Sequence, residues 1–230
     1  MVGLPLDAVL SHPAVWRGGD CARVTVPSVP TGFAELDALL PGGGWPAGML
    51  TEICTERPGV GELQIVMPAA AHLTRMGRWL ALVAPPYIPY APAFAAHGVK
   101  LSHLMLIQPK TDDEILWACE QALRTDDCGA TLAWLDHVRD RALRRLQLAA
   151  ESGGALAILF RSARAIPASP AALRLHVGKA GNKTVIRILK RRGCGVPAPV
   201  TLELYGSLSE RSGAPCPDIS GRTSAIEAAY

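Results

Sequence analysis

The sequence predicts an α/β domain in which helices flank a mostly parallel central sheet, with antiparallel strands added at one edge near the C-terminus. From residue 49 to residue 160, short apolar segments alternate with segments of helical periodicity, a pattern typical of a parallel sheet. The apolar segments contain few polar residues, as strands covered on both faces require. After Pro170 the pattern changes to polar–apolar alternation, which is typical of antiparallel strands.

A loop rich in glycine opens the core. Residues 33–40 have apolar residues at helical spacing after Thr31, a candidate N-cap, and residues 41–48 contain too many glycines and prolines for regular structure. We expect core strands at 49–54, 79–85, 104–108, 130–135 and 155–160. We expect helices at 62–77, 91–99, 112–125 and 141–152, and edge strands at 173–177, 184–192 and 200–206.

The chain of 230 residues is long enough for one core domain, which we place at residues 24–207. A short helix and connector are expected at residues 1–23. The small, polar and Pro/Gly-rich stretch at 208–230 is expected to be a flexible tail.

The composition of the chain limits the classes of function and the kinds of site that we expect. A net charge of +3 is too mild to indicate a nucleic-acid binder by itself, so the distribution of charge matters more than the total. Six cysteines without a C-x-x-C pair suggest reduced thiols rather than a zinc site or a disulfide framework, and the scattered histidines suggest no metal site. The N-terminus lacks the features of a signal peptide and no apolar run is long enough to cross a bilayer, so we expect a cytoplasmic chain.

Residues 56–63, "ERPGVGEL", occupy the place of a nucleotide-binding P-loop but lack its chemistry. Aligned on Gly61, Glu56 replaces the first glycine, Glu62 replaces the lysine and Leu63 replaces the magnesium-binding hydroxyl. A carboxylate in place of the lysine disfavours triphosphate binding by roughly 2–8 kcal/mol, depending on shielding. Gly59 and Gly61 are interpreted as turn residues that let strand and helix pack closely, so we expect no nucleotide cofactor, no metal and no enzymatic activity.

The order of motifs resembles the RecA recombinase core. "PTGFAELDALLPGGGWPAGMLTEI" is similar to the RecA lead-in to its nucleotide loop, and "VIRILKRRGCGVPAPVTLELYG" is similar to its edge strands. The resemblance implies where catalytic residues would fall. The glutamate that activates water falls near Pro86, the glutamine that senses the γ-phosphate falls near Ser162, and only Asp136 is acidic at its expected place. The segments that match the DNA-binding loops of RecA are short, so a RecA-like filament on DNA is not expected.

The centre of the chain, residues 78–108 and 122–161, resembles the cell-division inhibitor SulA, a reduced RecA-like fold. A RecA-like lead-in combined with a SulA-like centre most resembles the ImuA family. That resemblance implies a non-catalytic accessory role in SOS-induced translesion DNA synthesis, in the cytoplasm, with nucleoid association left open. The implied partners are the Y-family-like protein ImuB, RecA and an error-prone DnaE-type polymerase. The alternative is a SulA-like inhibitor that binds the tubulin-like division protein.

Two basic surfaces are candidates for contact. No acidic residue occurs from 165 to 200, and alternation predicts that Arg174 and His176 share a solvent face. This surface is interpreted either as a contact for DNA or an acidic partner, or as a charged edge that resists aggregation. Its basic residues are Arg174, Lys179, Lys183, Arg187, Lys190, Arg191 and Arg192.

The second candidate is the helix at 141–152, with leucines at 143, 146 and 148 on the core side. It is either an ordinary covering helix or a docking site that presents Arg141, Arg144 and Arg145.

Overall fold

A computed structural model describes residues 27–136, 138–163, 169–192 and 195–204. The predicted N-terminal helix and connector at 1–23 and the predicted tail at 208–230 lie outside these residues, as do Tyr205 and Gly206 of the last predicted strand. Within the described part, no helix combines the length and the apolar character needed to cross a bilayer.

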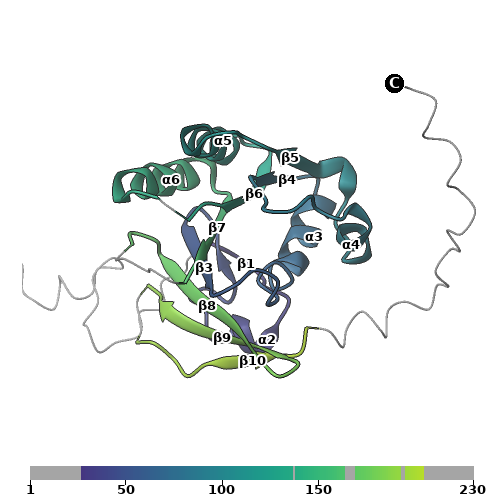
Figure 1. The fold of residues 1–230 in the computed structure, drawn as a ribbon, viewed down its shortest axis with the longest axis vertical. Coiled ribbons are helices and arrows are strands. Elements are labelled where there is room, and N and C mark those ends of the chain that lie inside the picture. Colours follow the sequence, from purple (N-terminus) through teal and green to yellow (C-terminus); the bar gives the residue numbers. More distant parts are fainter. Residues whose placement is uncertain (1–26, 137, 164–168, 193–194, 205–230) are drawn as a thin grey trace, which may run out of the picture.

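The described part contains an eight-stranded sheet in the order β10-β9-β8-β3-β7-β6-β4-β5, which confirms the predicted α/β class (Figure 1). The strands β3 to β8 pair in parallel, and β9 and β10 extend the sheet antiparallel at one edge. The strands are β3 (Leu50–Thr55), β4 (Trp79–Val83), β5 (Leu104–Ile107), β6 (Cys128–Trp134), β7 (Leu156–Ser162), β8 (Leu173–Ala180), β9 (Lys183–Lys190) and β10 (Val200–Leu202).

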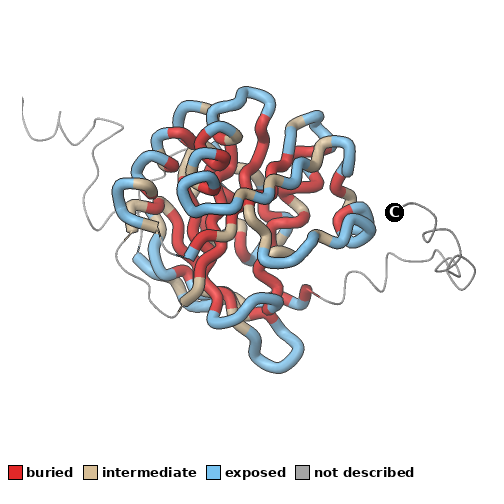
Figure 2. Tube along the Cα trace, turned by 45° about the horizontal axis from the view of Figure 1, so that its top comes forward, coloured by how far each residue is buried: buried red, intermediate tan, exposed pale blue. Residues whose placement is uncertain are grey.

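Helices cover both faces of this sheet and bury two apolar clusters. The helices are α2 (Ala34–Asp37), α3 (Met67–Arg75), α4 (Ala91–Ala96), α5 (Asp112–Arg124) and α6 (Asp140–Gly153), with a short 3₁₀ turn η1 (Leu101–His103) before β5. The cluster beneath α2, α3 and α4 contains Ile53 and Phe160, whereas the cluster beneath α5 and α6 contains Leu50 and Leu159. Neighbouring strand residues thus point to opposite faces, and Figure 2 shows the buried strands at the centre of the molecule.

Three details differ from the sequence prediction. Helix α3 begins at Met67 rather than at residue 62, because Pro68 has no N–H to donate and is tolerated only in a first helical turn. Helix α2 is only one turn, and Phe33 rather than Thr31 precedes it. The Thr31 N–H instead donates to the Asp37 carboxylate at 2.9 Å, which closes a local turn.

The segment before β3 also forms a small sheet, which we did not predict from the sequence. Strand β1 (Ser28–Val29) pairs antiparallel with β2 (Trp45–Pro46), and Trp45 is fully buried. Gly44 lies so close to β1 that a Cβ there would come 2.3 Å from the Val29 carbonyl oxygen. At Gly44 the chain is therefore in close backbone contact with β1, and no larger residue fits at this position.

Candidate functional site

The loop between β3 and α3 holds the residues aligned with a P-loop. Gly59 and Gly61 have φ of 85° and 105°, a region that glycine adopts without strain. The loop is also held from outside, because the Thr184 hydroxyl of β9 donates to the Val60 carbonyl at 3.2 Å. A Cβ on Gly61 would lie 2.7 Å from Leu204, so the chain that follows β10 closes over this turn.

The carboxylate of Glu62 fills this loop from within. Its two oxygens accept hydrogen bonds from the backbone N–H groups of Gly59, at 2.8 Å, and Val60, at 2.9 Å. Glu62 is buried, with 8% of its surface exposed. In a P-loop, backbone N–H groups of this kind bind phosphate oxygens. The protein therefore supplies its own anion to these two donors, and a phosphate at this position would have to displace a buried carboxylate.

At the other positions that match catalytic residues of RecA, the chain has Pro86, Ser162 and Asp136. Pro86 lies in an exposed loop after β4, and Glu56 is exposed at the end of β3. Asp136 accepts a hydrogen bond from the Ser162 N–H at 2.6 Å, so this carboxylate joins the ends of β6 and β7. Asp136 thus connects the ends of two neighbouring strands.

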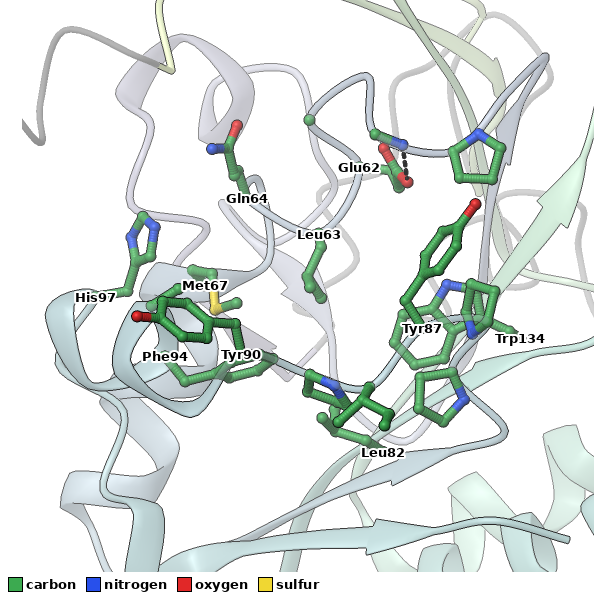
Figure 3. Close-up of a pocket in the computed structure, with 18 residues that line it drawn as sticks. Glu62, Leu63, Gln64, Met67, Leu82, Tyr87, Tyr90, Phe94, His97 and Trp134 are labelled. Atoms are coloured by element: carbon green, nitrogen blue, oxygen red, sulfur yellow. Dashed lines mark hydrogen bonds between the residues drawn. The ribbon is translucent and has the colours of Figure 1, made fainter. Parts of the chain in front are cut away.

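An apolar groove of about 430 Å³ opens beside the loop (Figure 3). Its walls come from the loop, from the end of β4 with the proline-rich segment 85–90, and from α4. Tyr87, Ile88 and Tyr90 on this segment are 74%, 82% and 72% exposed. Trp134 lines the groove and stacks on Phe160, with ring centroids 4.7 Å apart. Large exposed aromatic and aliphatic side chains beside an apolar groove are typical of a protein-binding surface.

The groove was missed from the sequence because its parts are separated along the chain. The signal that was present is "PPYIPY", residues 85–90, an unusually apolar loop with three prolines. His97 also lines the groove, and burial lowers the pKa of its imidazole. Proline restricts this segment before any partner binds, which reduces the entropy cost of association.

Arg174 does not lie on a solvent face as predicted, because it takes part in a buried ion cluster. Glu52 of β3 contacts Arg161 of β7 and Arg174 of β8, each at 2.7 Å. The Nε–H of Arg174 is not aligned on the carboxylate, so that contact is an ion pair without a hydrogen bond. Ser169 Oγ donates to Glu52 at 2.8 Å, and Arg161 donates to the Asp136 carbonyl at 3.1 Å. The alternation pattern correctly placed Arg174 on the same face of β8 as His176. It could not reveal that a buried carboxylate on the adjacent strand pairs with Arg174 on that face.

The remaining residues of the predicted basic surface have different surroundings. Lys183 pairs with Glu203 at 2.6 Å, and Lys190 donates to the Ser169 carbonyl at 2.8 Å. Arg191 donates to the carbonyls of Leu39 and Gly195. Arg192 approaches the sulfur of Met49 at 3.9 Å, and Lys179 and Arg187 are exposed. The run of basic residues is therefore not one surface.

Helix α6 presents a mixed stripe to solvent. Arg141 and Arg144 are exposed, whereas Arg145 pairs with Glu120 of α5 at 2.7 Å. Leu148, predicted on the core side, is 63% exposed, because residues 143, 146, 149 and 150 form the buried face. The candidate docking stripe thus consists of Arg141, Arg144 and Leu148.

The described thiols are buried and unpaired. Burial raises the pKa of Cys119 to about 12, with a smaller contribution from Glu120, and it also raises the pKa of Cys54 and Cys128. Among the described residues, no group of three or more His, Cys, Asp or Glu side chains could hold a metal ion.

Comparisons with known proteins agree with this fold. Residues 48–157 match the family model described as "Cell division inhibitor SulA". The chain is also similar to proteins named RecA: 30% identical over 127 residues to that of Crocosphaera subtropica, and 32% identical over 113 residues to that of Prochlorococcus marinus strain MIT 9303. These matches cover 54% and 49% of this chain, but only 36% and 29% of those relatives. The fold and the matches together define a SulA- and RecA-like α/β domain, which spans about a third of the length of the RecA proteins.

The ion cluster gives a prediction for stability. Glu52→Gln would leave two buried guanidinium groups without a counter-charge, and we expect it to lower the free energy of unfolding by about 3–5 kcal/mol. Urea denaturation followed by circular dichroism measures this loss. The matched control is Glu203→Gln, which removes an exposed carboxylate from Lys183 and should leave the midpoint unchanged. Equal shifts for the two variants would contradict the role of the cluster.

Proposed function

We propose that the chain is a non-catalytic accessory protein of the SOS response that supports translesion DNA synthesis through protein–protein contacts. The observation that carries the proposal is the Glu62 carboxylate, bonded to the Gly59 and Val60 N–H groups of a P-loop-like turn. Similarity to SulA and RecA points to the SOS response. The resemblance to ImuA supplies the finer role, with ImuB as the expected partner and with RecA and a DnaE-type polymerase in the same assembly.

The chemistry of the loop supports a role without ATP hydrolysis. Phosphoryl transfer depends on positioned cations and a water-activating base, because negative charge spreads over the transferring phosphoryl group. Here a carboxylate lies among the loop donors, a leucine stands at the magnesium-binding position, and Pro86 stands where the base would fall. The fold then contributes surfaces rather than catalysis.

The groove beside the loop is the surface we assign to the protein partner. Its rim offers Tyr87, Ile88 and Tyr90 as large side chains that a partner would bury. Aromatic anchors commonly carry most of the energy of an interface. The stripe on α6 is the second surface, and variants on the two surfaces separate their contributions.

One prediction of this proposed function concerns ATP. Titration of labelled ATP with magnesium should show no saturable binding in the micromolar range, because the charge at Glu62 opposes the phosphates and its oxygens occupy two loop donors. A RecA protein in the same assay is the positive control. A micromolar Kd for this chain would contradict the proposal.

The second prediction concerns ImuB. Immobilised chain should retain ImuB, and the double variant Ile88→Asp/Tyr90→Asp should weaken binding about 30-fold or more, since losing hot-spot anchors costs at least about 2 kcal/mol. Met76→Asp is the control, because Met76 is 66% exposed at the end of α3, outside the groove lining.

An empty pull-down with folded wild-type chain would contradict the proposal. Full binding by the groove variant, with loss in Arg141→Ala/Arg144→Ala, would move the interface from the groove to α6.

A second candidate function is inhibition of cell division through the tubulin-like division protein. The observation that favours it is the match of residues 48–157 to the SulA family model. Overexpression separates the two functions: we expect normal cell length with altered damage-induced mutation. Filamentous cells, with wild-type and groove-variant chains compared at equal abundance, would favour the inhibitor instead.

A further inference from the structure

A second concavity is lined by β8 and β9 and carries basic side chains, in contrast to the apolar groove. This basic hollow has a volume of about 970 Å³ and lies between the turn after β3 and the β8–β9 hairpin. Its lining includes Arg57, His176, Lys179, Arg187, Val185 and Leu189. We propose that it binds the phosphodiester backbone of a nucleic acid strand.

The face of β8 and β9 that forms the hollow is open within the described part of the chain. Helices α5 and α6 pack on this side of the sheet, yet the cluster that they bury includes no residue of β8 or β9. The two strands lie away from α5 and α6 in Figure 1. Leu189, on this face, is 40% exposed. As far as the described residues go, the hollow is therefore an accessible surface rather than a gap in the core.

The charges around the hollow are unbalanced. His176 of β8 lies directly opposite Arg187 of β9 in the antiparallel register, so an imidazole and a guanidinium group are neighbours across the two strands. Among the described residues that line the hollow, Glu56 is the one carboxylate. Within the described residues neither Arg57 nor Arg187 has an ion-pair partner, in contrast to Arg174 and Lys183. A bound polyanion would supply the missing negative charge.

The side chains favour phosphodiester over an acidic peptide. The guanidinium groups of Arg57 and Arg187 each offer a planar fork of donors that matches two phosphate oxygens. Arg57 lies in the turn after β3, whereas Arg187 lies on β9. Successive phosphates of one strand could therefore be held at two points. Val185 and Leu189, which flank Arg187 on the same face of β9, add apolar surface to the hollow, and this suits sugar and base surfaces better than carboxylate side chains.

The hollow contains a different set of basic residues from the run predicted between residues 174 and 192. Arg57, far from that run in the sequence, joins the hollow, whereas Arg174 and Lys183 are neutralised elsewhere. It also does not depend on which protein occupies the groove, because the hollow and the groove share no lining residue.

Fluorescence anisotropy with a labelled oligothymidylate of about 20 nucleotides, longer than the site of one small domain, tests the hollow. Arg57→Gln/Arg187→Gln should raise the Kd about tenfold or more and should lower the slope of log Kd against log salt by about 1.4, from two lost phosphate contacts. Arg141→Gln/Arg144→Gln removes the same charge from α6 and should change neither quantity. Both arginines in the hollow are exposed, so the variant should keep its urea midpoint and its binding to ImuB.

Three results would overturn the proposal. They are no binding by the wild-type chain at low salt, an equal loss in the α6 control, and displacement of the DNA by polyglutamate as readily as by unlabelled DNA. The last result would assign the hollow to an acidic protein. A duplex of the same length, run in parallel, shows whether single or paired strands are preferred, and binding of either one supports the phosphodiester site.

Discussion

The arrangement of the sheet depends on one buried carboxylate. Glu52 lies on β3, between β7 and β8, and contacts an arginine from each of them at 2.7 Å. Strand β8 belongs to both parts of the sheet, because it is parallel to β3 and antiparallel to β9. The cluster therefore joins the parallel core to the edge hairpin that carries the basic hollow. Removing charge from water at three positions is costly, which makes the three side chains strongly interdependent.

The turn at the carboxyl end of the same strand is held by contacts from both sides. Glu62 satisfies two N–H groups from within, and Thr184 and Leu204 pack against the turn from outside. The sites proposed for partners, the groove and the basic hollow, both border this loop. Strand β3 and its turn thus position both surfaces, although Glu62 and Leu63 stand where a phosphate-binding loop has its lysine and its hydroxyl.

Most of the fold could be predicted from the sequence because strands covered on both faces are almost wholly apolar, and the helices between them have clear periodicity. The start of α3 was wrong because the effect of Pro68 outweighs the pattern around it. Arg174 and Leu148 were misplaced because alternation and spacing identify a face but not what packs against it. The loss of P-loop residues could be predicted residue by residue. The groove and the hollow could not, since each joins segments that only the folded sheet brings together.

The self-filled loop has a consequence for control. In a chain that binds no nucleotide, as proposed, the two N–H donors of the turn stay bonded to Glu62. Under the proposed function, the surfaces around it would be displayed in one form throughout the life of the protein. Occupancy would then follow mass action, so that the cell would set the strength of the response through how much of the chain it makes and how quickly it is degraded.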